Sequence, residues 1–297
     1  REQCDHFVDL HGSTAEEIAA RIAADGIDIL IDMNGYKLNG RSEVFALRPA
    51  PVLAGWVGYP STLGLGLLDY LIVDGTVVPE SAQHCYAEKI VRLPHCNLPT
   101  GLRGTGEWPT PSRREAGLPG SGTIFCVFYR HEKIDPQVFA AWMRILKRVP
   151  GSVLWLQAGR GEDNLRRHAV AAGIEPGRLV FARPLAQWEA YLARLRLADL
   201  YLDALTFNTH TQGAEALWAG VPLVTCPGEH WVARVGASLL RATGLDDLIV
   251  DSLEDYEALA CDLALHPARL AAVKQRLTSA RDTCPLFDTP QIGRAHV

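Results

Sequence analysis

The chain has 297 residues, of which 48% are apolar and 21% charged, so it is long enough for two globular domains with separate cores. Its formal net charge of −5 and pI near 6.1 argue against a general binder of nucleic acid or anionic membranes, because the positive field that such partners need is missing. An anionic ligand therefore has to be bound by a local site.

Seven cysteines form no C-x-x-C pair, and an odd number does not suit a framework of disulfides. Cys126 and Cys226 lie in apolar, strand-like runs, where a reduced cysteine acts as a packing residue. Neither a signal peptide nor an apolar stretch long enough to cross a bilayer is evident. These features predict a soluble protein of the cytoplasm with reduced cysteines.

Apolar runs alternate with amphipathic segments along the first 121 residues, which is typical of an α/β domain. An apolar strand is expected up to Leu10, followed by a helix that Ser13 or Thr14 caps and Gly26 ends. Further strands are expected at residues 27–32, 52–57, 69–73 and 90–93. Since the chain lacks an initiator methionine, we expect this first domain to be incomplete.

Between residues 94 and 122 the composition shifts to Pro, Gly, Thr and Arg, which is typical of an interdomain loop. We place the domain boundary there, with residues 1–121 as the first domain and 122–291 as the second. A helix with Asp135 as N-cap and Pro136 at its first position is expected in the second domain. Strands are expected at residues 123–129, 153–156, 179–181, 200–203, 221–225 and 248–250.

The most informative stretch is residues 200–225, which is predicted to form a strand, a polar loop, a short helix and a second strand. This pattern puts the polar residues 208–212 at a helix N-terminus, where free backbone N–H groups and the helix dipole favour a phosphate. A simpler alternative stays open: Thr209 or Thr211 only caps the helix, and Glu215 complements its dipole.

Three polar loops follow predicted parallel strands, at residues 130–133, 182–191 and 208–215. Parallel sheets bind ligands at the carboxyl ends of their strands, so these loops are expected to converge. Together they offer cations, a helix terminus for phosphate oxygens and a carboxylate for ribose hydroxyls. The sequence therefore predicts a site for a nucleotide diphosphate in the second domain.

Several stretches resemble a known family, among them DILIDMNGY at residues 28–36, WVGYP at 56–60, KIDP at 133–136 and LWAG at 217–220, together with residues 45–51, 145–150, 210–211 and 227–229. They resemble the catalytic region of O-linked N-acetylglucosamine transferase and the related SPINDLY-type transferases. The resemblance implies the GT-B fold, in which two Rossmann-like domains with parallel sheets face each other, the first of them incomplete here. It further implies inverting transfer of GlcNAc from UDP-GlcNAc to Ser or Thr of a protein acceptor, with no metal or other cofactor, no nucleic-acid or membrane partner, and tetratricopeptide repeats upstream in the parent protein.

The resemblance also assigns roles to the diphosphate-binding residues. Lys133 corresponds to the family lysine that binds the diphosphate and stabilises the leaving UDP, and His210 and Thr211 to the phosphate-contacting pair. These matches make Lys133 and His210 the candidate catalytic residues, although a solvated lysine and a structural histidine are the simpler alternatives. Arg130 stands where the family usually has an amide, and Gln212 where it often has a second threonine.

The remaining matches concern the base and ribose. Ala186 and Arg194 match the base-binding segment, Tyr191 replaces a family histidine beside uracil and can stack on the base, and Glu215 stands at the position of an acidic ribose ligand. Phe207 replaces a small residue near the sugar pocket, a departure that concerns the sugar more than the nucleotide.

Other functions remain open. A SPINDLY-like enzyme transfers fucose from GDP-fucose, although the residues around Trp218 are closer to the GlcNAc branch. An epimerase resembling UDP-GlcNAc 2-epimerase shares the GT-B fold and needs no acceptor. The non-enzyme alternative is a nucleotide-sugar-binding pseudoenzyme, which the missing His-Pro loop of the family supports. The last six residues, 292–297, resemble a translated sequencing adapter, so we expect a fragment cut at both ends.

Overall fold

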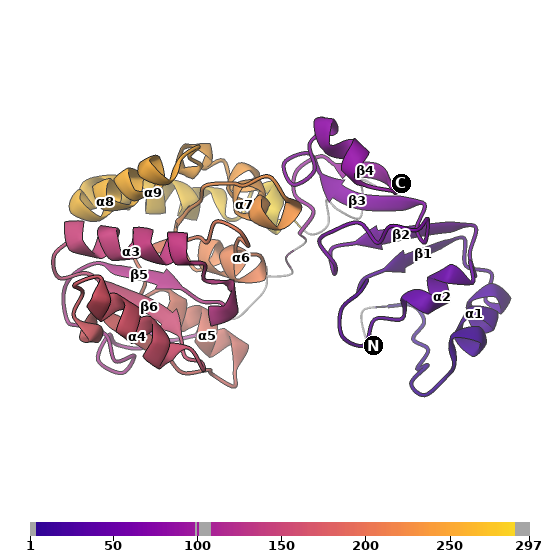
Figure 1. Ribbon diagram of the computed structural model, residues 1–297, viewed down its shortest axis with the longest axis horizontal. Helices are drawn as coiled ribbons and strands as arrows, with labels where there is room; N and C mark the ends of the chain where they lie inside the picture. The colour runs from indigo at the N-terminus through magenta and orange to yellow at the C-terminus, as the bar shows by residue number, and fades with distance from the viewer. Residues whose placement is uncertain (1–3, 99, 101–107, 289–297) are drawn as a thin grey trace. The chain divides into compact units, whose positions relative to one another are not determined.

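In the computed structural model the chain divides into two compact units, residues 1–93 and 94–297 (Figure 1). The structure describes residues 4–98, 100 and 108–288, so the predicted adapter at 292–297 lies outside the described residues. None of the described helices combines the length and the apolar character needed to cross a membrane.

The first unit contains a four-stranded, fully parallel sheet in the order β1-β2-β3-β4. Its strands are β1 Ile29–Asp32, β2 Val52–Trp56, β3 Tyr70–Asp74 and β4 Lys89–Leu93, and its helices are α1 Ala15–Ala24, α2 Ser42–Ala46 and the 3-10 helix η1 Glu80–Cys85. The four strands agree closely with the predicted segments, because each is a short apolar run bounded by turn residues.

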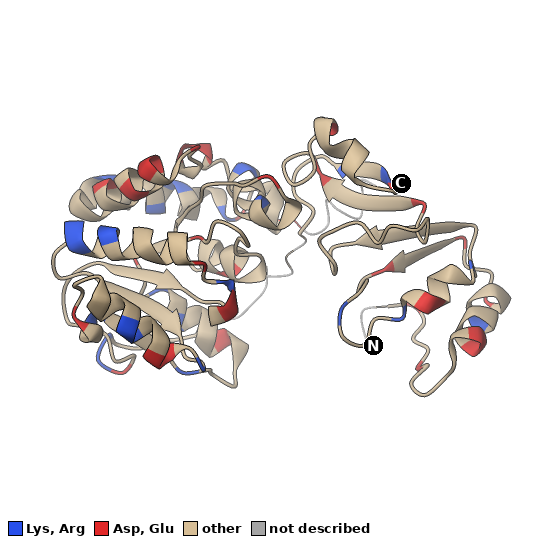
Figure 2. Cartoon of the chain, viewed as in Figure 1, with Lys and Arg blue, Asp and Glu red and all other residues tan. Residues whose placement is uncertain are grey.

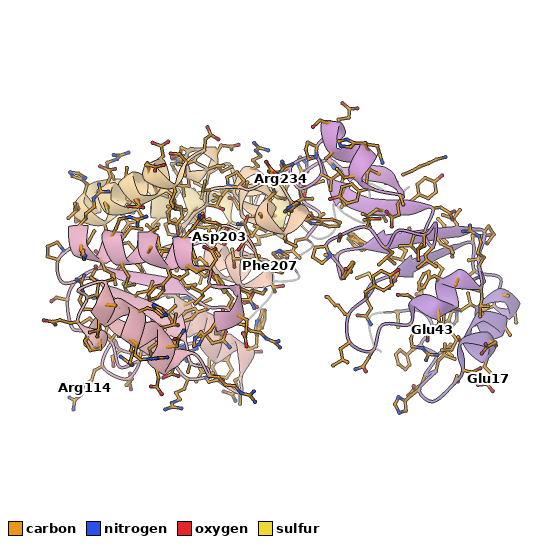
Figure 3. All side chains as sticks on the ribbon, in the orientation of Figure 1. Glu17, Glu43, Arg114, Asp203, Phe207 and Arg234 are labelled. Atoms are coloured by element: carbon orange, nitrogen blue, oxygen red, sulfur yellow. The ribbon has the colours of Figure 1, made fainter. Side chains whose placement is uncertain are left out.

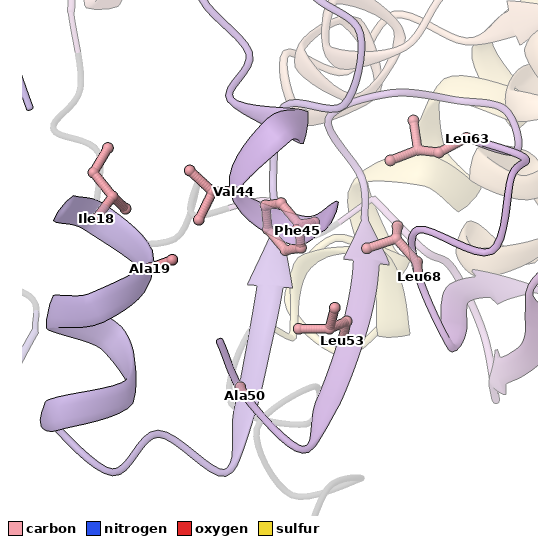
Figure 4. Packing of buried hydrophobic residues seen from close by; sticks show 8 residues of the cluster. All are labelled: Ile18, Ala19, Val44, Phe45, Ala50, Leu53, Leu63 and Leu68. Carbon is pink, nitrogen blue, oxygen red and sulfur yellow. The ribbon is translucent and has the colours of Figure 1, made fainter. Parts of the chain in front are cut away.

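A hydrophobic cluster joins the helices α1 and α2 of the first unit to its sheet (Figure 4). Ile18 of α1 and Phe45 of α2 pack with Leu53 of β2, all of them buried. By contrast, Ile29 and Ile31 of the edge strand β1 are largely exposed. The expected strand before Leu10 is wrong: residues 4–10 form no strand, and they have no place in a sheet in which β1 pairs with β2 alone.

The second unit contains a five-stranded parallel sheet in the order β7-β6-β5-β8-β9. The strands are β5 Ile124–Val127, β6 Val153–Gln157, β7 Leu179–Ala182, β8 Leu200–Leu202 and β9 Leu223–Val224. In chain order this is the doubly wound 3-2-1-4-5 arrangement of a Rossmann half, which changes direction between β5 and β8. The crevice at that point is where such sheets bind ligands.

Helices surround this sheet in the second unit (Figure 1). They are α3 Pro136–Arg148, α4 Glu162–Ala171, α5 Trp188–Leu195, α6 Thr211–Trp218, α7 Val235–Thr243, α8 Leu253–Leu265 and α9 Pro267–Ala280, with 3-10 helices η2 His131–Lys133, η3 Pro176–Arg178, η4 Trp231–Ala233, η5 Asp246–Leu248 and η6 Pro285–Phe287. Asp135 caps α3 as predicted, since its side chain accepts the N–H of Val138. The expected strand at 248–250 is wrong, because Ile249 forms only a single bridge with Thr225.

Residues 94–121, which the sequence analysis placed with the first domain, are grouped with the second unit. Arg113 explains part of this grouping, because its guanidinium donates to the carbonyl of Gly122 at 2.9 Å and to the carboxylate of Asp199 at 3.4 Å. The prediction of an α/β protein with two parallel sheets is confirmed.

Candidate functional site

The candidate site lies at the carboxyl ends of β5 and β8, on either side of the point where the strand order reverses. The hydroxyl of Tyr201 in β8 accepts the backbone N–H of Phe128, which follows β5, at 3.2 Å. The hydroxyl of Thr209 is also 3.2 Å from the Tyr201 hydroxyl. One buried tyrosine thus connects the end of β5 to the polar loop after β8.

Asp203 organises that loop (Figure 3). Its fully buried carboxyl group accepts the N–H groups of Ala204 at 2.9 Å and Thr209 at 2.6 Å, and the hydroxyl of Thr225 at 2.8 Å. Burial raises the pKa of Asp203 to about 7, against the opposing effect of these three bonds. Both ends of the loop, at residues 204 and 209, are therefore hydrogen-bonded to Asp203, the residue that follows β8.

Gly236 at the start of α7 packs directly on this cluster. A Cβ atom at this position would overlap the Asp203 carboxylate and the Thr225 hydroxyl, so only glycine allows the helix to approach so closely. The Gly236 N–H donates to the side-chain oxygen of Asn208 at 3.2 Å. The polar loop is thus fixed from β8, β9 and α7.

The N-terminus of α6 is open to a ligand. The helix begins at Thr211, its N-cap residue is His210, and no side chain caps it. Thr209 bonds to Tyr201 instead, so the alternative that Thr209 or Thr211 serves only as a cap is wrong. Uncapped N–H groups at a helix start are available to an anion.

A pocket of about 290 Å³ lies beside α6. Five of the predicted site residues line it: Ala186, Tyr191, Arg194, Gln212 and Glu215. The other lining residues are Phe128, Gln157, Ala182, Pro184, Leu185 and Trp188. Residues predicted from two separate loops therefore line one cavity, of the size and mixed polarity that a small ligand needs.

Glu215 is the acidic group of the pocket. Its carboxylate accepts the indole N–H of Trp188 at 2.9 Å. Burial raises the pKa of Glu215, and the bond from Trp188 acts in the opposite direction. Burial likewise raises the pKa of the Tyr191 hydroxyl, which stays neutral at ordinary pH.

Arg194 is buried and forms part of the pocket wall. Its guanidinium donates to the carbonyl of Arg183 at 2.6 Å and lies 5.8 Å from the rings of Phe128 and Trp155. Burial lowers the pKa of Arg194. No ion pair joins it to a carboxylate within the described residues, so its charge remains available to a polar ligand.

Lys133, the predicted diphosphate ligand, is half-buried after β5. Its Nζ atom lies 3.7 Å from the centroid of the Phe207 ring, and that ring stacks on the imidazole of His210 with centroids 4.9 Å apart. Burial lowers the pKa of Lys133, the charge of Arg130 lowers it further, and Asp203 acts in the opposite direction. The structure therefore brings both candidate catalytic residues to one aromatic side chain.

Arg130 and Thr211 are exposed, and neither lines the pocket. Between Arg130 and Lys133, His131 is structural: its Nε2 is 2.7 Å from the carbonyl of Gln157, and its Nδ1 accepts the N–H of Gly161 at 3.0 Å. His131 thereby holds the loop after β6 against the loop after β5. Across residues 4–98, 100 and 108–288, no group of three or more His, Cys, Asp or Glu side chains is placed to hold a metal ion.

The sequence analysis missed two residues that shape the site, Trp188 and Asp203. Trp188 falls within the predicted loop 182–191, where a tryptophan in a polar loop was a usable signal for a ligand contact. Asp203 was predicted only as the end of a strand. Its role depends on hydrogen bonds from Ala204, Thr209 and Thr225, and the sequence does not show that these residues meet.

The sequence profile described as glycosyl transferase family 41 matches residues 1–101 and 97–295, which is nearly the whole chain. The chain belongs to this glycosyltransferase family. It is 40% identical over 297 residues to an Arabidopsis thaliana protein named probable UDP-N-acetylglucosamine–peptide N-acetylglucosaminyltransferase SEC, covering 97% of this chain and 30% of the relative. A Caenorhabditis elegans UDP-N-acetylglucosamine–peptide N-acetylglucosaminyltransferase is 29% identical over 407 residues, covering 97% of this chain and 35% of the relative.

Among solved structures, a mutant of the Thermobaculum terrenum O-GlcNAc transferase superposes with a TM-score of 0.88 and 29% sequence identity, covering 100% of this chain and 57% of that one. This match confirms the predicted GT-B fold class. The chain spans about a third of the length of the curated relatives, 30% and 35% of the two named above. The chain therefore corresponds to one part of these longer relatives.

Proposed function

We propose that this family 41 chain acts in UDP-GlcNAc-dependent protein O-glycosylation, transferring GlcNAc with inversion to Ser or Thr of an acceptor protein. The names of the Arabidopsis and C. elegans relatives support the donor and the peptide acceptor. The observation that carries the proposal is the pocket beside α6, which is lined by the base-binding candidates, by Glu215 and by Gln212 at the start of the helix.

Within this pocket each side chain has a role that its chemistry suits. Tyr191 offers an aromatic face for the uracil base, and Ala186 and Arg194 border the same space. Glu215 accepts hydrogen bonds from the ribose hydroxyls. Gln212 stands at the start of α6, between the pocket and the open helix terminus.

The diphosphate would lie at the N-terminus of α6, bound by His210, Thr211 and Lys133, with exposed Arg130 adding positive charge. Negative charge grows on the UDP leaving group as the sugar is transferred. The Lys133 ammonium is half-buried, where its attraction for that charge is less screened by water than at the surface. Lys133 therefore supplies the electrostatic help that a metal ion gives in other transferases, and no cofactor is part of the proposal.

Beyond the pocket, we propose a cytoplasmic parent protein in which tetratricopeptide repeats upstream recruit the acceptor. The absence of a spanning helix among the described residues and an odd number of cysteines with no C-x-x-C pair are compatible with the cytoplasm. No role with nucleic acid or membranes is proposed, since acidic and basic side chains are interspersed over both units (Figure 2).

Calorimetric titration of the whole chain with UDP, in buffer containing EDTA, tests the donor site. Lys133→Ala should weaken UDP binding by about tenfold to over a hundredfold, because it removes a charge-assisted hydrogen bond worth roughly 1.5–3 kcal/mol. The matched control is Lys147→Ala, which removes an exposed lysine of α3 and should leave the affinity unchanged.

Four results would contradict the proposal. Binding of UDP that disappears in EDTA would show a metal-dependent site. Tighter binding of GDP-fucose than of UDP-GlcNAc would favour a SPINDLY-like fucosyltransferase. Release of a 2-epimer from UDP-GlcNAc without an acceptor would favour the epimerase, and donor binding without transfer by the full-length parent would indicate a pseudoenzyme.

A further inference from the structure

Lys133 is held in an unusual way for a half-buried lysine. Within the described residues its ammonium forms no hydrogen bond and no ion pair, and its specific contact is the Phe207 ring, 3.7 Å from Nζ to the ring centroid. The nearest influential carboxylate, Asp203, already accepts bonds from Ala204, Thr209 and Thr225. No protein group among the described residues therefore accepts from the three N–H donors of the ammonium.

The same ring also contacts the second candidate catalytic residue. Phe207 stacks on His210 with an interplanar angle of 21° and ring centroids 4.9 Å apart. Phe207 thus touches two side chains that are distant in the sequence and lie on loops that follow different strands.

The backbone on both sides of Phe207 is anchored. The Thr206 hydroxyl donates to Asp135, the N-cap residue of α3, at 3.2 Å. The next residue, Asn208, donates its backbone N–H to the carbonyl of Val232 at 2.8 Å and its side-chain amide to that of Ala204 at 2.6 Å. The position of the ring is therefore set by the loop and does not depend on a ligand.

We propose that Phe207 is a positioning residue for the diphosphate of the nucleotide sugar, because its ring holds the Lys133 ammonium and the His210 imidazole in place before the donor binds. The inference rests on the proposed function and deepens it. The residue touches the two phosphate-binding side chains and acts on the ligand through them.

An aromatic ring suits this task better than a carboxylate. The negative face of the ring attracts an ammonium group but adds no net charge to the site. A carboxylate in its place would neutralise Lys133, occupy its donors and repel the incoming diphosphate. The ring therefore leaves the charge and the N–H groups of Lys133 available when the phosphates arrive.

The test uses two variants of the whole chain. Phe207→Leu keeps an apolar side chain but removes the ring, whereas Phe207→Tyr retains the ring. We expect Phe207→Leu to weaken UDP binding by about threefold to tenfold, the range that a cation–π contact supports, and to leave the affinity for uridine unchanged. Phe207→Tyr should bind UDP within about twofold of the parent.

Phe181→Leu is the matched control. Phe181 also faces a cation and a histidine, with the Arg166 guanidinium 4.7 Å from its ring centroid and the His131 ring 5.9 Å away. Removing this ring tests for general effects of losing an aromatic side chain in the same unit. We expect UDP affinity to stay at the parent value.

Proton NMR of the unliganded chain measures the contact between Lys133 and the Phe207 ring directly. The ring should shift the proton resonances of the Lys133 ε-methylene upfield, and the shift should be lost in Phe207→Leu and kept in Phe207→Tyr. Lys133→Ala identifies the resonance by removing it.

The outcomes separate this inference from the function on which it rests. If Phe207→Leu binds UDP as tightly as the parent while Lys133→Ala does not, the positioning role is wrong and the donor site stands. If UDP and uridine affinities fall together, the ring has only a structural role and the inference is overturned. A parent that does not bind UDP but shows the upfield shift refutes the proposed function, and with it the positioning role, although the contact itself is real.

Discussion

The bond between Trp188 and Glu215 fixes one carboxylate oxygen in the pocket, since the indole N–H lies 2.9 Å from Oε1. The Tyr191 hydroxyl also influences this carboxylate. The proposed function assigns the remaining acceptor capacity of the carboxylate to a ribose hydroxyl. Trp188 is the first residue of α5, and its side chain is 39% exposed, so little core packing depends on it. Substituting Trp188 should therefore act mainly by removing its hydrogen bond to Glu215.

Trp188→Phe should therefore reduce the preference for UDP over dUDP. The parent is expected to bind UDP about tenfold more tightly or better, because a carboxylate loses a charged hydrogen bond when the 2′-OH is absent. The variant keeps an aromatic wall but no longer orients Glu215, so the ratio of the two affinities should fall toward one. Calorimetric titration with UDP and with dUDP measures the ratio of the two affinities. Trp218→Phe serves as the control. An unchanged ratio in Trp188→Phe would show that Trp188 does not position Glu215.

Asp203 should make the stability of the protein depend on pH. Its pKa is about 7 in the folded chain against 3.8 for the unperturbed group. Between these values the unfolded chain releases a proton that the folded chain keeps, so the contribution of Asp203 to stability is full below about pH 4 and is lost as the pH rises through 7.

Asp203→Asn should remove this dependence. Its side-chain oxygen can still accept the N–H groups of Ala204 and Thr209, which both bond to Oδ1, and its amide can donate to Thr225. Thermal unfolding between pH 5 and 8 should show a smaller decline with rising pH in the variant than in the parent. Parallel curves would show that Asp203 does not titrate in this range.

At the scale of the element, α1 begins with a complete capping box. The Thr14 hydroxyl accepts the N–H of Glu17 at 3.2 Å, and the Glu17 carboxylate accepts the N–H of Thr14 at 2.9 Å. The sequence left Ser13 and Thr14 as equal candidates, and the structure assigns the cap to Thr14. Thr14 and Glu17 each accept the backbone N–H of the other, and these two N–H groups have no hydrogen-bond partner within the helix itself.

Thr14→Ala should destabilise the protein by about 1 kcal/mol, the usual cost of removing an N-cap side chain. Ser13→Ala is the matched control, one residue earlier, and should change the unfolding free energy by less than about half that amount. Urea unfolding followed by circular dichroism measures both. Equal losses in the two variants would mean that the capping box does not stabilise α1.

At the scale of the whole molecule, the pocket and the Lys133–Phe207–His210 contacts all belong to the second unit. Nucleotide binding should therefore be a property of that unit. A chain trimmed to residues 94–288 should bind UDP within about threefold of the affinity of the whole chain, because binding residues keep their neighbours. Calorimetry compares the two, and binding that requires residues 1–93 would show that the first unit contributes to the donor site.

Much of the fold was predictable because it depends on local pattern. The nine strands of the described part of the chain follow short apolar runs, and the start of α3 follows from Asp135 and Pro136. The two errors share a cause, since residues 4–10 and 248–250 contain apolar side chains typical of strands but join no ladder of strands. Strand formation needs a partner, which a local pattern does not show.

The sequence by itself determined the α/β class, the family resemblance and the residue types of the site, because motifs and periodicity are local. Only the tertiary structure decided which of them meet: the strand order places the loops after β5, β7 and β8 together, so that Trp188 reaches Glu215 and Phe207 reaches Lys133. The burial that shifts the pKa of Asp203 is likewise a product of packing by β9 and α7. Contacts between distant residues depend on topology, and topology is a property of the whole folded unit.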